Sequence, residues 1–80
     1  MEVKKEYISV TARFDKDKGI LPVSIQWEGV EIPVDKVEDV RNAASMRVGG
    51  FGVRYTVRIQ NKSRLLWLEE DKWFVEKRIG

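Results

Sequence analysis

The stretch VGGFGVRYTVRI, residues 48–59, joins three glycines to a strict alternation of apolar and polar residues. Four apolar residues recur at every second position after the glycines: Val53, Tyr55, Val57 and Ile59. A period of two indicates a β-strand with one buried face. Glycine permits a bulge or a close approach between backbones, so the stretch predicts a corner that leads into a core strand.

The same alternation recurs on both sides of this stretch. It appears in YISVTARF, LPVSIQWEG and VEIPV before it, and in RLLWLE and WFVEKRI after it, with turn residues between the segments. In the first of these segments, Ile8, Val10 and Phe14 share the apolar face. Six short strands joined by tight turns predict an all-β antiparallel meander. We expect residues 1–80 to form one domain, a half-open barrel or roll of the SH3-like kind, with an OB-like barrel as the alternative.

The segment 35–46, DKVEDVRNAASM, departs from the period of two. Asp35 and Glu38 have the spacing of a capping box. The apolar residues that follow stand at helical spacing: Val37, Val40 and Ala44. The segment predicts either a short helix over 35–46 or an irregular connection that packs Val37 and Val40 under the sheet.

The composition excludes several kinds of chemistry. Cysteine and histidine are both absent, which removes thiol nucleophiles, imidazole bases and the usual zinc ligands. No serine lies beside a base, and the acidic residues gather in predicted turns, where they are commonly solvated. We therefore expect no catalytic residue, no cofactor and no metal. The short apolar runs and the missing cysteine predict a cytoplasmic protein without a membrane segment.

Charge is distributed unevenly along the chain. No carboxylate lies between Asp39 and Glu69, whereas six cationic residues do: Arg41, Arg47, Arg54, Arg58, Lys62 and Arg64. Such a segment predicts one basic face. The alternative is that the arginines cover the sheet with their aliphatic stems and pair with acids on neighbouring strands: Glu28, Glu31 or Glu76.

The position of Trp67 depends on the register of the hairpin that follows Gln60. A two-residue turn at Asn61-Lys62 places Trp67 on the face of Arg54 and Arg58, where it could stack between guanidinium groups. A three-residue turn instead places Trp67 on the buried face of the preceding strand. We favour the first register, which leaves Leu65 and Trp67 outside and in need of a cover.

Two functions fit these features. The first is a non-catalytic interaction module that offers an edge strand or a Trp/Leu patch to an unknown protein partner or to a second copy of the chain. The second is a weak, sequence-tolerant binder of single-stranded nucleic acid that uses the basic segment 41–64. The candidate binding residues for either function are Arg47, Phe51, Arg54, Arg58, Lys62, Arg64 and Trp67.

Three segments resemble a group of small uncharacterised bacterial β-domains: SIQWEGVEIPV, RYTVRI and DKWFVEK. The resemblance covers about three-quarters of the chain, and the positions that carry it are mainly apolar. It implies the SH3-like fold and no particular activity, because no functional residues can be transferred from the group.

Overall fold

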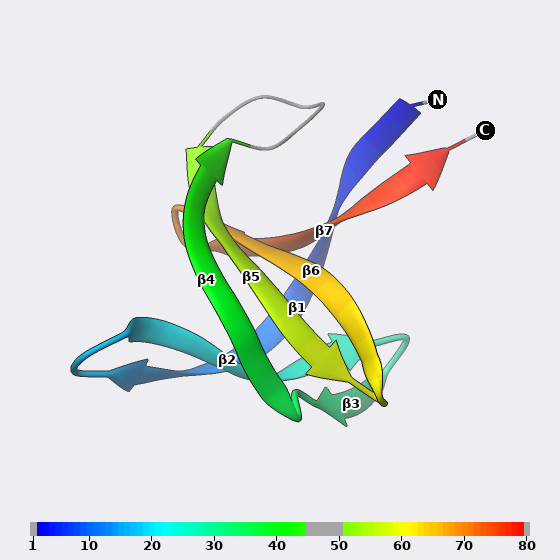
Figure 1. The fold of residues 1–80 in the computed structure, drawn as a ribbon. Coiled ribbons are helices and arrows are strands. Elements are labelled where there is room, and N and C mark those ends of the chain that lie inside the picture. Colours follow the sequence, from blue (N-terminus) through cyan, green and yellow to red (C-terminus); the bar gives the residue numbers. More distant parts are fainter. Residues whose placement is uncertain (1, 45–50, 80) are drawn as a thin grey trace.

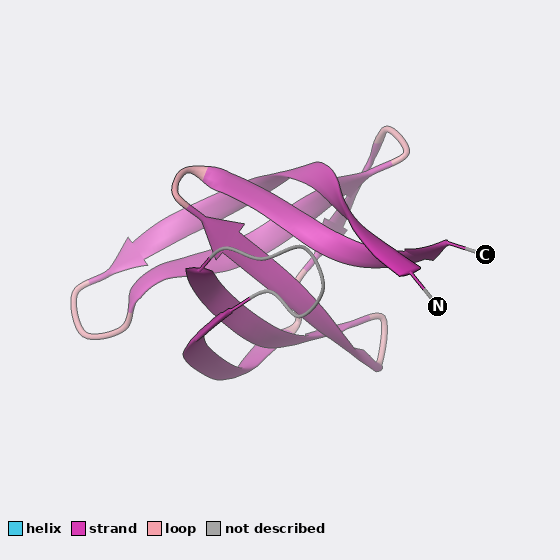
Figure 2. Ribbon diagram, turned by 90° about the horizontal axis from the view of Figure 1, so that it is seen from above, coloured by secondary structure: helices cyan, strands magenta, loops and turns pink. Residues whose placement is uncertain are grey.

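The computed structural model describes residues 2–44 and 51–79, and this part of the chain consists of seven strands and short loops (Figures 1 and 2). The strands are β1 (Glu2–Asp15), β2 (Gly19–Trp27), β3 (Val30–Pro33), β4 (Lys36–Ala44), β5 (Phe51–Ile59), β6 (Lys62–Glu69) and β7 (Lys72–Ile79). The predicted all-β, antiparallel class is confirmed. The predicted number of six strands is wrong, because β4 adds a seventh.

The seven strands form one antiparallel sheet in the order β3-β2-β1-β7-β6-β5-β4. β1 changes partner at its middle, since residues 2–8 pair with β7 and residues 9–15 pair with β2. The β1–β7 ribbon and the β1–β2 hairpin therefore extend in opposite directions from the centre (Figure 1). Phe14, near the end of that hairpin, is 79% exposed, so its predicted place on the buried face is wrong.

A two-residue corner connects the two outer strands of the sheet, β3 and β4. The Val34 N–H donates to the Val23 carbonyl of β2 at 2.8 Å, and the Asp35 N–H donates to the Arg58 carbonyl of β5 at 2.8 Å. Consecutive amides thus bind opposite ends of the sheet and curl it into a half-barrel. This arrangement shields the concave face from water, as a small sheet requires.

The predicted helix or irregular connection at 35–46 is wrong over its described part, which is strand β4. Its pairing with β5 shifts between Val37, opposite Val57, and Asp39, opposite Thr56. A β-bulge therefore inserts Glu38 into the strand, and Val37 and Val40 reach the same face three positions apart instead of two. The bulge reproduces the spacing of a helix without forming one. Residues 45 and 46 lie outside the described part.

The core lies on the concave side of the sheet. Its buried residues come from β2, β5 and β6: Leu21, Ile25, Tyr55, Val57, Ile59, Leu66 and Leu68. Tyr55 also spans the barrel, because its hydroxyl donates to the Ile20 carbonyl at 2.6 Å. Burial raises the pKa of Tyr55 above its ordinary value, so the phenol remains a proton donor at neutral pH. The four apolar residues of the opening stretch thus lie on the concave side, as predicted: Val57 and Ile59 are buried and Val53 is partly buried.

Gly52 lies where the backbones of β5 and β6 approach closely. A Cβ atom on Gly52 would lie 2.6 Å from the Leu68 carbonyl oxygen, a distance that no side chain tolerates. The predicted close approach is therefore confirmed at this glycine. Gly49 and Gly50 lie outside the described residues.

Candidate interaction cleft between β6 and β7

The β5–β6 hairpin is paired along its whole length, in a register that differs from both predicted ones. Ile59 pairs with Lys62, so the turn consists of Gln60 and Asn61. Both turn residues are left-handed, with φ of 51° and 66°. This is the type I′ geometry that suits the twist of a two-residue hairpin. The asparagine that marks the turn stands in its second position, one place later than the sequence interpretation assumed.

The β6–β7 hairpin is paired only near its turn. Glu69 pairs with Lys72, Leu68 with Trp73 and Trp67 with Phe74, and the ladder stops there. Beyond this point β6 remains paired with β5, and β7 remains paired with β1. Figure 1 shows β6 and β7 leaving their shared turn in different directions. A cleft thus opens within the sheet, between two strands that are neighbours in sequence.

The register fixes which backbone groups face this cleft. Residues that flank a two-residue turn exchange hydrogen bonds, and such pairs alternate along an antiparallel ladder. From the Ile59–Lys62 pair, the amides and carbonyls of Arg64 and Leu66 point towards β5. Those of Ser63 and Leu65 point the other way, into the cleft and outside any described ladder.

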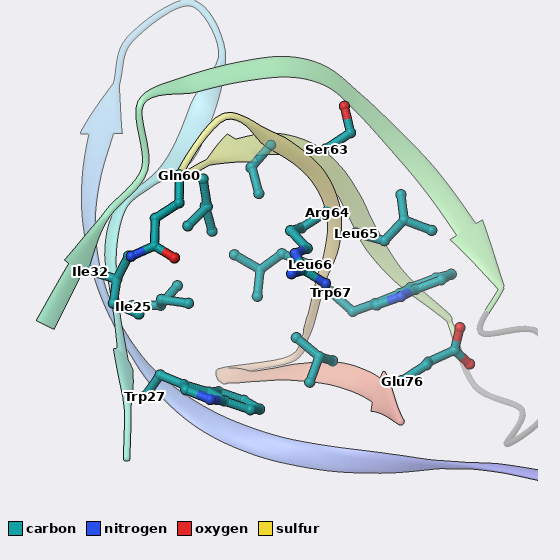
Figure 3. Close-up of a pocket in the computed structure, with 13 residues that line it drawn as sticks. Ile25, Trp27, Ile32, Gln60, Ser63, Arg64, Leu65, Leu66, Trp67 and Glu76 are labelled. Atoms are coloured by element: carbon teal, nitrogen blue, oxygen red, sulfur yellow. The ribbon is translucent and has the colours of Figure 1, made fainter. Parts of the chain in front are cut away.

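A cavity of about 500 Å³ occupies the cleft (Figure 3). Seven apolar residues, four of them buried and three partly buried, form much of its wall: Ile25, Val57, Ile59, Leu66, Trp27, Ile32 and Val75. Gln60 extends from the β5–β6 turn towards Ile32 on the opposite wall (Figure 3). The cavity lies within the 300–1,000 Å³ range that is usual for ligand pockets, with few polar groups among apolar ones.

Arg64 brings a positive charge into this apolar cavity. It pairs with Val57, so its side chain shares the concave face with Leu66, and Figure 3 shows both on the concave side of the sheet. Arg64 is exposed, so the cavity is open to solvent at this point. Among the described residues, Arg64 makes no ion pair. The carboxylate of Glu76 also lines the cavity, but it already has an interaction of its own.

Trp67 lies on the face of Arg54, as the favoured prediction required, but it is not exposed. It pairs with Arg54 on one side and with Phe74 on the other. Its ring stacks on Phe74 with centroids 5.9 Å apart and planes 7° apart, and only 1% of Trp67 is exposed. The ring is therefore covered and offers no open face to a nucleic-acid base. Its indole Nε1–H is buried without a hydrogen-bond acceptor.

The cover over this aromatic stack includes the N-terminal half of β1. The Lys5 ammonium lies 4.9 Å from the Phe74 ring centroid and donates to Glu69 Oε1 at 2.5 Å. That hydrogen bond raises the pKa of Lys5 above its ordinary value. Tyr7 contacts Phe74 edge-on, with centroids 5.9 Å apart. The two contacts to Phe74 hold β7 against β1, and the Lys5–Glu69 ion pair joins β1 to the end of β6.

The structure brings the predicted pair Arg54 and Arg58 to one face of β5, but in different environments. Arg58 binds Glu38 through Nε and Nη2, at 3.4 and 3.2 Å, and Ser63 donates to the same carboxylate at 2.9 Å. These contacts, led by the Ser63 hydroxyl, hold the pKa of Glu38 below its ordinary value. The predicted acid pairing is therefore found for Arg58, with Glu38 in place of the acids that were expected. Arg54 is half-buried, and its Nε atom has no acceptor.

Of the remaining predicted residues, the structure describes the side chains of Lys62 and Arg64. Lys62 is exposed at the start of β6, and Arg64 faces the concave side. Phe51 begins β5, and its side chain is not described; Arg47 lies outside the described residues. The sequence interpretation missed the cavity wall from β2, β3 and β7. One signal was present, since RLLWLE carries apolar residues on both faces of its strand, which indicates contacts on both sides.

Comparisons with known proteins add no assignment. No family model matches the chain, and neither a curated protein nor a solved structure is significantly similar to it. Within residues 2–44 and 51–79, no cluster of three or more acidic side chains could hold a metal ion. The same residues include no helix long and apolar enough to cross a membrane.

Proposed function

We propose that this protein is a non-catalytic interaction module that accepts an extended segment of a partner protein in the cleft between β6 and β7. The observation that carries the proposal is the end of the β6–β7 ladder at Trp67 and Phe74, in the middle of two strands that continue. Backbone groups that lack ladder partners beside an apolar cavity favour strand addition. In that mode, main-chain hydrogen bonds supply affinity and side-chain pockets supply specificity.

The two outer edges of the sheet are poorer sites for an added strand. β3 has four residues and ends at Pro33, which cannot donate a hydrogen bond. β4 carries the bulge at Glu38 and the charged residues Asp39 and Arg41, which pair with each other at 2.7 Å. Short edges, bulges and charges are the usual protection against unwanted pairing. The stretch from Ser63 to Leu66 has no proline and no bulge, and its charged residue, Arg64, lies on the concave face.

Leu65 offers a substitution that separates binding from folding. Its N–H points into the cleft, so Leu65→Pro removes a donor that the β5–β6 ladder does not use. Leu65→Val is the matched control, since it keeps the N–H and an apolar side chain. We expect peptides selected from a random octapeptide library to bind the wild type and Leu65→Val, and to lose about tenfold or more in affinity for Leu65→Pro.

A selection that enriches no peptide on the wild type relative to Leu65→Pro would contradict strand addition. Thermal melts of the three proteins provide the folding control. Sedimentation of the purified chain tests whether the partner is a second copy, which would appear as a dimer that the same Leu65→Pro substitution dissociates.

Nucleic-acid binding is the second candidate function, and one observation favours it. Arg41 and Arg54 stand directly opposite each other on β4 and β5, and within the described residues Arg54 has no ion pair. This function predicts that labelled single-stranded oligonucleotides bind at low salt and dissociate steeply as salt rises, because phosphate contacts release counterions. Binding that is insensitive to Arg54→Ala would count against it.

Three finer assignments belong to the same proposal. The corner at residues 34–35 and the curled sheet support a variant of the SH3-like kind with an extra strand. The lack of cysteine supports a cytoplasmic location. A bacterial origin rests on the sequence resemblance alone.

A further inference from the structure

We infer that the segment bound in the cleft carries an acidic side chain that Arg64 recognises, two positions after an apolar side chain that fills the cavity. This inference rests on the proposed function, since it concerns the same cleft. It specifies the chemistry of the partner: an extended acidic-apolar peptide with the order apolar, any residue, acidic.

The unpaired charge of Arg64 provides the first argument. Arg64 is exposed, but it shares the concave face with the buried Leu66 and lines the same cavity. A ligand that covered Arg64 without a carboxylate would desolvate the charge and leave it uncompensated. A ligand with a carboxylate at this point forms charge-assisted hydrogen bonds, which are about twice as strong as neutral ones.

The charged groups around the cavity provide the second argument. Glu76 is the acidic residue of the described wall, and it is already engaged. Arg64 is the cationic residue of that wall and makes no ion pair among the described residues. A ligand that carries a carboxylate would supply the missing partner.

The register of an added strand fixes the spacing. A peptide that pairs antiparallel with β6 places one residue opposite Leu65, in the hydrogen-bonded position. The residues before and after it then lie opposite Leu66 and Arg64, and both side chains point to the concave face. Because the peptide runs against β6, the residue opposite Leu66 comes first. An apolar side chain there meets the cavity wall, and an acidic side chain two positions later meets Arg64.

The octapeptide selection described above tests this order directly. From an enriched peptide we would prepare three labelled versions: the original, one with glutamine in place of the acid, and one with the acid moved by a single position. Moving the acid by one residue places it on the opposite face of the strand. We expect both altered peptides to bind the wild type about tenfold more weakly by fluorescence anisotropy.

Variants of the protein complete the test. Arg64→Gln should bind all three peptides with similar affinity, and Arg64→Lys should retain part of the preference for the original. Lys62→Gln is the matched control, because it removes a cation from the same face of β6 outside the cavity wall. This control should leave the preference unchanged.

The outcomes separate the two proposals. Enriched peptides without an acidic residue, or equal binding of the three peptides to the wild type, would overturn the role of Arg64 and leave strand addition intact. No enrichment over Leu65→Pro would overturn strand addition itself. Salt-sensitive oligonucleotide binding in place of peptide binding would transfer the function to the nucleic-acid candidate.

Discussion

The β5–β6 and β6–β7 hairpins share a strand and each turn on two residues, but seven residue pairs join the first and three join the second. The difference does not come from strand length, since β5, β6 and β7 have nine, eight and eight residues. It comes from β1, which competes with β6 as a partner of β7. β7 is paired with β1 along its length, and Lys5, Tyr7 and Phe74 fix that pairing on the convex face.

The comparison shows that over one stretch of β6 one edge can be hydrogen-bonded to a neighbouring strand while the other edge stays open. Leu66 faces the core and is 2% exposed, whereas its neighbour Leu65 is 46% exposed and directs its backbone groups into the cleft. One side of β6 therefore contributes to stability, and the other side is the one to which we assign the proposed binding. A protein of this size can separate the two because adjacent residues in a strand point in opposite directions.

The largest expected effect comes from substituting these two leucines. Leu66→Ala creates a cavity in the core beside Tyr55 and should lower the free energy of unfolding by about 2–5 kcal/mol. Leu65→Ala removes a half-exposed side chain and should cost about 1 kcal/mol or less. Urea denaturation of both variants provides the measurement. Equal losses would mean that the two edges of β6 are not distinct.

Amide hydrogen exchange sharpens the same comparison without any substitution. The N–H groups of Arg64 and Leu66 belong to the β5–β6 ladder, whereas those of Ser63 and Leu65 face the cleft. We expect the first pair to exchange on the order of a hundredfold more slowly than the second, because their exchange requires the ladder to open. An absence of alternation along β6 would show that β6 and β7 pair fully in solution.

The Gly52→Ala substitution tests the fully paired β5–β6 hairpin. The new Cβ would lie 2.6 Å from the Leu68 carbonyl oxygen, so β5 and β6 would have to separate locally. We expect a loss of about 1–3 kcal/mol in the free energy of unfolding, as for other overpacked sites. A thermal melt measures the loss. Gly29→Ala is a control in open space, although its φ of 79° adds backbone strain.

The smallest expected effect concerns Glu38 and pH. Hydrogen bonds from Ser63 and Arg58 lower the pKa of this carboxyl in the folded protein. The folded state therefore gains stability from Glu38 above the unfolded pKa, near 4.5, and loses it as the pH falls through the lowered value. Glu38→Gln should flatten the decline in melting temperature between about pH 5 and pH 3. An unchanged decline would show that other carboxylates, such as Asp15, dominate it.

The sequence was informative where the side-chain pattern alone determines structure. Alternation located β5, β6 and β7 and placed Val57 and Ile59 in the core. It failed at β4, because the inserted Glu38 changes a spacing of two into a spacing of three. It also failed at Phe14, which lies near the end of the β1–β2 hairpin and is exposed. A period of two does not indicate that a hairpin extends beyond the core.

The candidate site was less predictable than the fold. The sequence pointed to Arg64 and Trp67 as binding residues, but it grouped them with Arg58, which the structure pairs with Glu38. The cleft itself has no local signature. It arises because β6 pairs with β5 and β7 pairs with β1. The alternation of apolar and polar residues within a strand does not indicate which distant strand it will pair with.

The position of β1 has a consequence for how fast this chain reaches its native state. β1 lies between β2 and β7, and Ile8 pairs with Trp73, so the sheet is incomplete until nearly the whole chain has been closed into a loop. The β4–β5–β6 hairpins need only local turns, whereas the β1–β7 ladder must first overcome the entropy of that closure. Folding should therefore take milliseconds to seconds, in the range typical of β-proteins dominated by non-local pairs, with β7 docking on β1 as the late step.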